Sequence, residues 1–212
     1  LYRDIWDNKP PLLYIIYALF GGDQFWVRLT SLIVMLLTIA VFYRLALRLF
    51  TNVMTVRIVT ALFAILFAMP ILEGNIANSE NFMLLPIILS LYLVISNKQF
   101  FLAGLLLGIS FLLKIVAVFD LGAALSFLFV VWGLKDKEEW IKKSFVLSLG
   151  FITPIVLTFF YFFLNGSLAD FITAVFSQNV SYVGAGNKLF VGQGLLILKL
   201  LLLGIFCLVI FW

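Results

Sequence analysis

The run FFLAGLLLGISFLLKIVAVFDLGAALSFLFVVWGL, residues 100–134, decides the fold of this chain, and its only charged residues are Lys114 and Asp120. A transmembrane helix needs about 20 apolar residues, so this run is too long for one span. It also lacks the polar stripe that a soluble amphipathic helix would show. We therefore predict two transmembrane helices, at residues 100–116 and 118–134, joined by a tight turn that carries both charges at one face of a membrane.

The composition of the whole chain leads to the same class of protein. Apolar residues make up 65% of the 212 residues and charged residues 11%, with a mean hydropathy of +1.21. Soluble domains have about 45–50% apolar and about 25% charged residues. These values exclude a soluble enzyme, a disordered tail, a nucleic-acid-binding domain and a disulfide scaffold, the last also because Cys207 is the only cysteine. Histidine, the commonest general base and metal ligand, is absent.

Five further apolar runs flank the two predicted helices, and they do not alternate as the strands of a β-barrel would. They predict spans at residues 25–50, 57–72, 82–96, 145–164 and 189–212. The predicted fold class is an all-α, polytopic transmembrane bundle of about seven spans, and residues 1–212 are predicted to form a single transmembrane domain. Within it, residues 1–24 are an outer juxtamembrane segment and residues 25–212 hold the helical spans. Because the chain starts at Leu1 and stops at Trp212 within an apolar run, we expect it to be part of a longer protein.

Seven spans divide the loops into two sets of different charge. One set holds eight Lys or Arg residues against three Asp or Glu residues, a net charge of +5, and the other holds six against seven, a net charge of −1. Loops rich in Lys and Arg stay in the cytoplasm. This predicts that residues 1–24, 73–81, 114–120 and 165–188 lie on the outer face. Candidate chemistry is expected on that face, because most carboxylates without a neighbouring lysine lie there.

The first polar cluster is LYRDIWDNKPPL at the start of the chain. It carries Arg3, Asp4, Asp7, Asn8 and Lys9 directly before two prolines. The prolines hold Lys9 at a corner between loop and helix, at the start of a helix over residues 12–20 that is too short to span a membrane. A lysine beside a helix N-terminus suits a phosphate. The alternative is an ordinary interfacial loop in which the prolines only start the helix.

The second cluster, EGNIANSEN at residues 73–81, is unusually polar for a link between two spans. One interpretation is structural, with Ser79 as the cap of the next helix and Glu80 in its first turn. The other is functional, with Glu80 or Asn78 binding a polar substrate or a cation, and Glu73 as a weaker candidate.

The third cluster is Lys114 with Asp120. A cation near the membrane level must pair with an acid or bind an anion, so Lys114 either pairs with Asp120 or binds a lipid-linked phosphate. Gly104 and Gly108 precede it at a spacing that suits close helix packing. At the opposite face, the amphipathic stretch KDKEEWIKK at residues 135–143 predicts a separate interfacial helix anchored by Trp132 and Trp140.

The order of these features resembles that of the bacterial glycosyltransferases that depend on a lipid carrier and share the membrane fold called GT-C. Their relatives include the protein O-mannosyltransferases and the transferase that adds aminoarabinose to lipid A. Five elements carry the resemblance: a Tyr-x-Asp stretch, a Lys-Pro-Pro helix start, an Arg at the head of a span, a Ser-Glu outer loop, and a Gly-x3-Gly helix that ends in Lys. They are Tyr2 and Asp4, Lys9 to Pro11, Arg28, Ser79 with Glu80, and Gly104, Gly108 and Lys114.

The resemblance implies sugar transfer from a polyprenyl-phosphate carrier to an acceptor glycan, lipid or protein at the outer face of the cytoplasmic membrane. It implies that Lys9, with Arg3 and Lys114, binds the phosphate, and Asp4, Asp7, Asn78 and Glu80 are the candidates for substrate binding. The catalytic aspartate of the relatives would lie upstream of Leu1, so the catalytic residue of this chain is not assigned. The resemblance implies no certain cofactor.

Metal binding and transport are two further questions that the sequence raises. Asn8 stands where the aminoarabinose transferase has a glutamate, so we predict no metal site like that relative's, and a divalent cation stays an open alternative. A transporter or lipid-sugar flippase, and a non-catalytic membrane subunit, are the competing functions. Transporters place polar residues near the middle of several spans, whereas here the spans are apolar and the polar residues gather at one face. This pattern favours the transferase.

Overall fold

The computed structural model describes residues 2, 3 and 7–178, and every regular element in that part of the chain is helical. The chain divides into two compact units, which are described separately. Of the described residues, the first unit contains 9–168 and the second contains 2, 3, 7, 8 and 169–178. The predicted span at residues 189–212, together with Cys207, lies outside the described residues.

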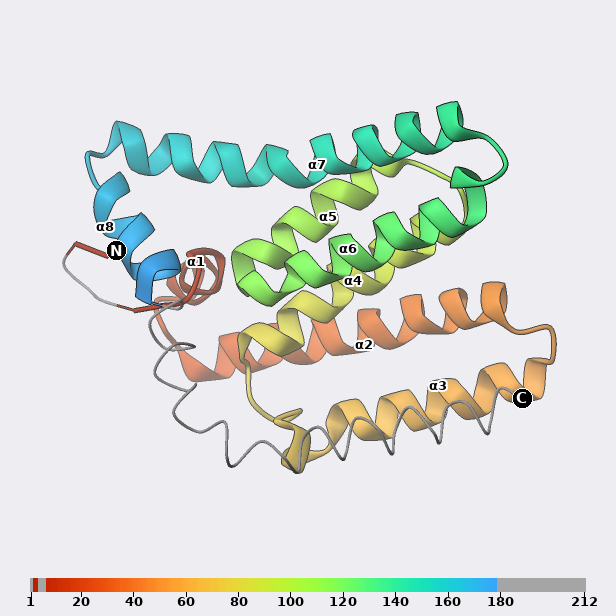
Figure 1. Ribbon diagram of the computed structural model, residues 1–212. Helices are drawn as coiled ribbons and strands as arrows, with labels where there is room; N and C mark the ends of the chain where they lie inside the picture. Colours follow the sequence, from red (N-terminus) through yellow and green to blue (C-terminus); the bar gives the residue numbers. More distant parts are fainter. Residues whose placement is uncertain (1, 4–6, 179–212) are drawn as a thin grey trace, which may run out of the picture. The chain divides into compact units, whose positions relative to one another are not determined.

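Seven α-helices form the first unit (Figure 1). They are α1 (Leu12–Leu19), α2 (Gln24–Leu49), α3 (Val53–Ala68), α4 (Ser79–Ile95), α5 (Phe100–Leu113), α6 (Val118–Leu128) and α7 (Lys137–Leu164). Short helical turns join them at η1 (Pro70–Leu72), η2 (Ile115–Ala117) and η3 (Phe129–Gly133). The second unit contains α8 (Leu168–Ile172), which starts at the last residue of the first unit, and the π-helical turn η4 (Thr173–Ser177).

The helices lie where the apolar runs predict them. Gln24–Leu49, Ile115–Gly133 and Lys137–Leu164 are long and apolar enough to cross a membrane. Helices α3, α4 and α5 are apolar too but have 16, 17 and 14 residues. The predicted run at residues 57–72 ends earlier than expected, because Pro70 follows Met69 and a residue before proline is driven out of the helical conformation.

Polar side chains start most of these helices by accepting bonds from backbone N–H groups that have no partner inside the helix. Asp23 accepts from the N–H of Phe25 at 2.8 Å at the start of α2, and Asn52 accepts from that of Met54 at 2.8 Å at the start of α3. Asp136 accepts from Glu139 at 3.0 Å at the start of α7.

The start of α7 corrects the prediction of a separate interfacial helix. The KDKEEWIKK stretch is continuous with the apolar helix after it, because Asp136 caps the helix and no proline or glycine stands between Lys137 and Phe145. Lys143 is buried there. Its Nζ lies 3.4 Å from the centre of the Trp132 ring and 3.2 Å from the Glu139 carboxylate. An aromatic face and an acid together stabilise a buried cation.

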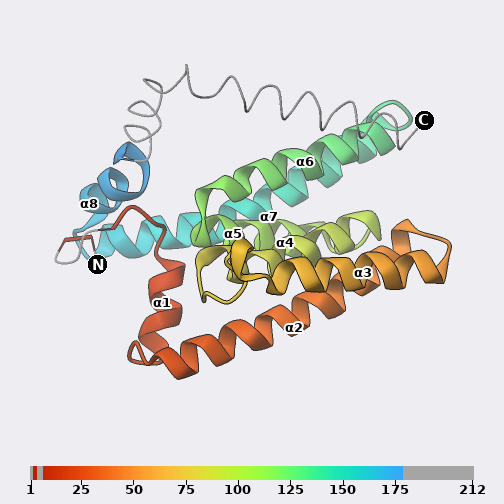
Figure 2. The same ribbon diagram turned by 90° about the horizontal axis from the view of Figure 1, so that it is seen from below.

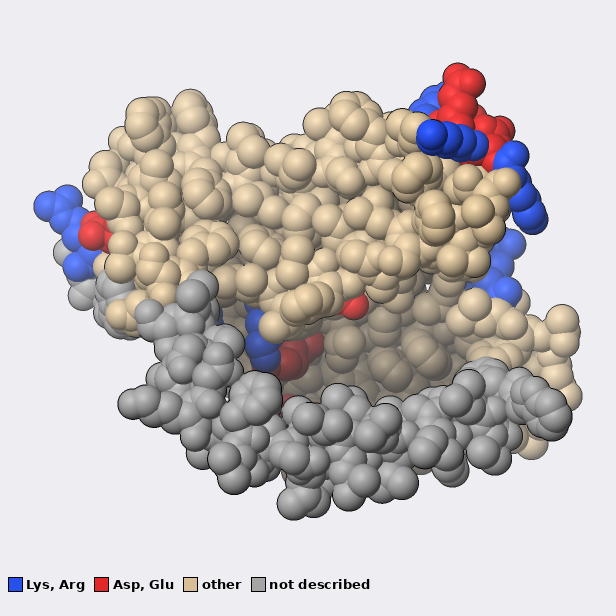
Figure 3. Space-filling model, viewed as in Figure 1, with Lys and Arg blue, Asp and Glu red and all other residues tan. Residues whose placement is uncertain are grey.

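The loops of the first unit alternate between its two ends (Figures 1 and 2). The links at residues 50–52, 96–99 and 134–136 lie at one end, and the links at residues 69–78 and 114–117 lie at the other, with α1. These two groups are the two sets of loops that the charge count separates. Figure 3 shows a largely uncharged surface over the helices, with Lys, Arg, Asp and Glu gathered where α7 begins.

The core of the first unit lies where α5 passes between α4 and α7. Ala103, Leu107, Ala124 and Leu147 are fully buried in it. Gly104 and Gly108 bring the backbone of α5 onto that of α7, since a Cβ added at Gly104 would overlap the carbonyl oxygen of Leu147. The predicted role of these glycines in close packing is therefore confirmed.

Candidate functional site

Helix α1 begins directly after the Lys-Pro-Pro corner, as the sequence predicts. The N–H of Ile15 donates to the carbonyl of Pro11 at 3.1 Å, and Lys9 is exposed just before the two prolines. The helix has only 8 residues and ends before Gly21 and Gly22, which both take positive φ. Lys9 therefore stands at a fixed bend at one end of the bundle.

The link between α3 and α4 is held by its own polar side chains. Asn78 caps α4 by accepting from the N–H of Asn81 at 3.1 Å, and its amide donates to the Glu73 carboxylate at 2.8 Å. Asn81 is 3% exposed and donates to the carbonyls of Glu73 and Ile76. The predicted cap Ser79 is wrong by one residue: Ser79 is the first helical residue, and Asn78 has the extended backbone that a cap needs.

Lys114 pairs with Glu80, so the first of the two predicted alternatives, a pair with Asp120, is wrong. Helices α4 and α5 pack side by side and run in opposite directions, so the first turn of α4 meets the end of α5. Lys114 takes an extended backbone where α5 stops, at φ −157° and ψ 127°, while Asp120 lies beyond η2 in α6. Both members of the Lys114–Glu80 pair are a little under half exposed.

The charges around Glu80 keep it ionised. Burial raises the pKa of its carboxyl, but the hydrogen bond from Lys114 and the charges of Lys114 and Lys9 hold that pKa below the ordinary value of 4.5. The charge of Lys9 thus lowers the pKa of the same carboxylate that Lys114 contacts. We call Lys9, Glu80 and Lys114 the charged cluster. It carries two cations and one anion, which leaves it net positive.

Tyr17 links α1 to the segment that precedes α4 by a hydrogen bond. Its hydroxyl donates to the carbonyl of Ala77, in the link before α4. Burial, with the negative charge of Glu80, raises the pKa of Tyr17 above 10.0, so the hydroxyl keeps its proton and stays a donor. This contact cannot be predicted from the sequence, because nothing in the pattern shows which carbonyl a tyrosine 60 positions away will reach.

An apolar groove of about 280 Å³ begins beside the charged cluster. Its walls come from α1, α2, α4 and α5. Leu12, Phe82 and Leu113 stand close in sequence to Lys9, Glu80 and Lys114, respectively. The other lining residues are Ile16, Val34, Leu85, Pro86, Leu89, Leu106 and Ile109. A net positive cluster beside an apolar groove suits a molecule with an anionic head and a hydrocarbon tail.

A smaller cavity of about 160 Å³ lies at the same end of the unit, between α2 and the link before α4. Arg28, Ser31 and Asn75 supply its polar groups. Gly74 also lines it, packed so closely on α3 that a Cβ there would overlap the carbonyl oxygen of Phe67. The sequence singles out Arg28 only as the arginine at the head of a span.

The remaining predicted site residues belong to the second unit or lie outside the described part. Arg3 is exposed and Asp7 is half-buried in that unit. Tyr2 is buried there against Phe171, with 5.5 Å between ring centres, and burial together with the Asp7 charge raises the pKa of its hydroxyl. Asp4 lies outside the described residues. Among residues 2, 3 and 7–178, no three His, Cys, Asp or Glu side chains form a group that could hold a metal ion.

Comparison with protein families matches residues 9–164 to the model described as dolichyl-phosphate-mannose-protein mannosyltransferase. The chain belongs to this mannosyltransferase family. The matched region contains the whole charged cluster and the apolar groove, and it excludes Arg3, Asp4 and Asp7. No curated protein and no solved structure matches the chain. Membership of the mannosyltransferase family makes this a glycosyltransferase of a membrane-protein family, consistent with the apolar helices.

The shifted pKa of Glu80 gives a testable dependence of stability on pH. A carboxyl whose pKa is lower in the folded state contributes stability above its unfolded pKa and loses it as the pH falls through the folded pKa. Glu80→Gln should therefore lower the free energy of unfolding slightly at pH 7, by less than about 1 kcal/mol for such an exposed pair. The difference from the wild type should vanish as the pH falls below 4.5. Thermal unfolding of both proteins in detergent measures it, and a difference that stays constant with pH would contradict the ion pair.

Proposed function

We propose that this protein transfers a sugar from a polyprenyl-phosphate carrier to an acceptor glycan, lipid or protein at the outer face of the cytoplasmic membrane. The charged cluster binds the carrier phosphate, through Lys9 and Lys114. Arg3, which lies in the second unit, is a further phosphate-binding candidate. Asp4, Asp7, Asn78 and Glu80 are proposed to contact the sugar or the acceptor.

The observation that carries the proposal is that the Lys114–Glu80 pair stands next to the apolar groove along the chain, since Leu113 and Phe82 line that groove. A polyprenyl phosphate has an anionic head on a hydrocarbon tail, so the phosphate fits the net positive cluster and the first isoprene units fit the groove. A soluble nucleotide-sugar would gain nothing from an apolar groove that opens beside the cations.

The chemistry of the transfer defines what the lysines must do. The bond between the anomeric carbon and the phosphate oxygen breaks as the acceptor hydroxyl attacks that carbon, and a carboxylate takes the hydroxyl proton. Negative charge builds up on the departing polyprenyl phosphate. Lys9 and Lys114 offset that charge. Because the charge is larger in the transition state than in the bound donor, the two lysines stabilise the transition state more. No described residue is assigned as the base, because Glu80 is already held by Lys114.

The role of Lys9 is tested by turnover of the lipid-linked donor. Lys9→Ala in the full-length protein should lower kcat/KM by about tenfold or more, since one cation at the leaving phosphate is lost. Lys98→Ala is the matched control, because Lys98 is equally exposed but lies in the link between α4 and α5 at the opposite end of the bundle. Unchanged turnover with Lys9→Ala in a folded protein would rule out the phosphate role.

A further inference from the structure

A second, larger groove lies at the end of the bundle opposite the charged cluster. It has a volume of about 760 Å³, and α2, α3 and α4 supply its walls. We call it the arginine groove. Its lining residues are Leu36, Ile39, Ala40, Tyr43, Arg44, Leu47 and Arg48 of α2, Thr60 of α3 and Tyr92 of α4. Two arginines and three hydroxyl groups line it, and none of the lining residues is acidic.

The two arginines share one face of α2, since Arg44 and Arg48 stand four positions apart in a continuous helix. The Arg48 guanidinium lies 6.0 Å from the centre of the Tyr92 ring, a distance at which a cation–π contact holds it over the groove. Neither arginine pairs with an acid within the part of the chain that the structure describes. Two guanidinium groups side by side are well suited to bind phosphate oxygens, each through two parallel N–H donors.

The groove changes from apolar to cationic along α2. Leu36, Ile39 and Ala40 lie toward the middle of the helix, and the arginines lie near its end at Leu49. At 1.5 Å per residue, the distance along the helix from Leu36 to Arg48 is about 18 Å. This is slightly more than half of the hydrocarbon core, which is about 30 Å thick. The groove therefore matches one leaflet of a bilayer in both length and polarity.

From this match we propose that the arginine groove binds a phospholipid with a net negative headgroup. The headgroup phosphate contacts Arg44 and Arg48, the hydroxyls of Tyr43 and Tyr92 border it, and one acyl chain lies along Leu36 and Ile39. Basic pockets among transmembrane helices recognise such headgroups. The site is distinct from the donor site, because the two grooves lie at opposite ends of the first unit and share no lining residue.

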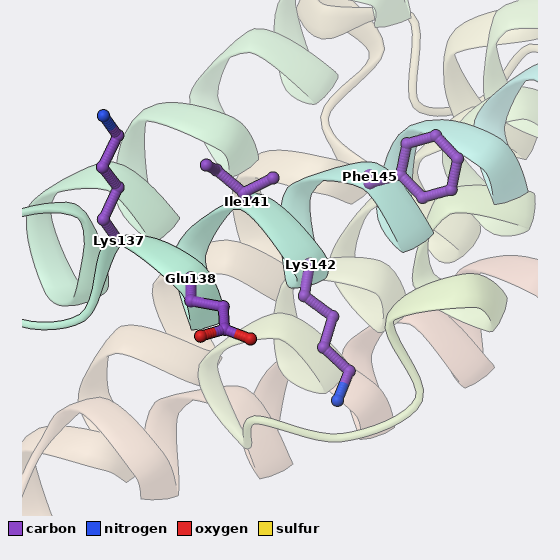
Figure 4. Close-up of a pocket in the computed structure, with 5 residues that line it drawn as sticks. All are labelled: Lys137, Glu138, Ile141, Lys142 and Phe145. Carbon is purple, nitrogen blue, oxygen red and sulfur yellow. The ribbon is translucent and has the colours of Figure 1, made fainter.

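A matched control is provided by two lysines at the same end of the bundle. Lys137 and Lys142 line a shallow surface at the start of α7, together with Glu138, Ile141 and Phe145. Figure 4 shows that the two lysine side chains point to opposite sides of the helix, with Glu138 on the same side as Lys142. They carry the same total charge as Arg44 and Arg48, but the acidic Glu138 lines the same surface, whereas no acidic residue lines the arginine groove.

The test measures lipid binding to the delipidated, full-length protein in detergent by native mass spectrometry. Phosphatidylglycerol should bind the wild type at least tenfold more tightly than phosphatidylcholine. The R44Q/R48Q variant should lose about tenfold or more in affinity for phosphatidylglycerol, and K137Q/K142Q less than about twofold. Inorganic phosphate at millimolar concentration should not displace the lipid, because it lacks the acyl chain.

Several outcomes would overturn the proposal. Equal losses in the two double variants would show attraction by net charge alone, and equal affinity for the two phospholipids would remove the headgroup preference. Displacement by inorganic phosphate would show a simple anion site. If R44Q/R48Q does not fold, Ile39→Trp fills the apolar part of the groove without changing its charge. That variant should also weaken phosphatidylglycerol binding, and unchanged binding would exclude the groove.

Discussion

Replacing Lys114 with glutamine in the full-length protein is expected to lower kcat/KM for the lipid-linked donor by about 100-fold. Lys114 stands at the end of α5, beside Leu113 of the apolar groove. Its extended backbone and its bond to Glu80 fix the ammonium group before the donor arrives. A cation already in place stabilises the leaving phosphate without reorganisation, which is why its loss should reduce the rate more than the loss of a mobile surface lysine.

The Lys114–Glu80 pair makes it possible to separate phosphate binding from a structural role. If Lys114 only held Glu80, then Lys114→Gln, Glu80→Gln and the double variant would all lower activity by the same small factor, since each breaks the same pair. If Lys114 binds the phosphate, Lys114→Gln should lower kcat/KM far more than Glu80→Gln. The double variant should then resemble Lys114→Gln. Steady-state kinetics on the four proteins, with thermal unfolding to check folding, measures the difference.

A conservative substitution and a distant control sharpen this test. Lys114→Arg keeps a cation at the same position and should recover much of the lost activity, because a guanidinium also binds phosphate oxygens. Lys142→Gln removes a lysine at the opposite end of the bundle and should leave kcat/KM unchanged. Equal turnover for the wild type and Lys114→Gln would exclude Lys114 from the donor site.

How well each part of this molecule can be predicted depends on how far apart in the sequence the interacting residues are. The helix positions depend on apolar runs and on local breakers such as Pro70, so the sequence predicts them closely. The cap of α4 was misplaced by one position, because Asn78 and Ser79 are both good caps and only the backbone conformation separates them. The prediction of a separate interfacial helix at residues 135–143 is wrong, since a charged first turn is compatible with a long apolar helix.

The partners within the candidate site could not be predicted, because they meet through packing. Lys114 and Glu80 are 34 positions apart, and Asp120 is the nearer acid in sequence. The antiparallel pairing of α4 and α5 brings Glu80 to the end of α5, and no local pattern encodes that contact. The order of motifs nevertheless picks out two lysines, Lys9 and Lys114, that both lower the pKa of one carboxylate in the structure, and their binding of a phosphate stays a prediction.

Replacing Gly104 with alanine is expected to destabilise the folded protein by about 1–3 kcal/mol. An added Cβ would overlap the carbonyl oxygen of Leu147 and approach the backbone nitrogen of Phe151 to 2.8 Å. Both are backbone atoms of α7, so the clash can be relieved only if the two helices move apart. Their separation would weaken the packing of the fully buried Leu107. It would also shift the end of α5, so activity should fall together with stability.

Gly122 of α6 provides the control, because the same substitution there should not lower the stability of the folded protein. A Cβ added there meets no atom within 4 Å. Alanine is favoured over glycine inside a helix by about 1 kcal/mol, so Gly122→Ala should leave the unfolding midpoint unchanged or raise it. Thermal unfolding of the two variants in detergent compares the same chemical change at a closed site and an open one. Equal midpoints for Gly104→Ala and Gly122→Ala would contradict the close approach of α5 and α7, because only that approach distinguishes the two glycines.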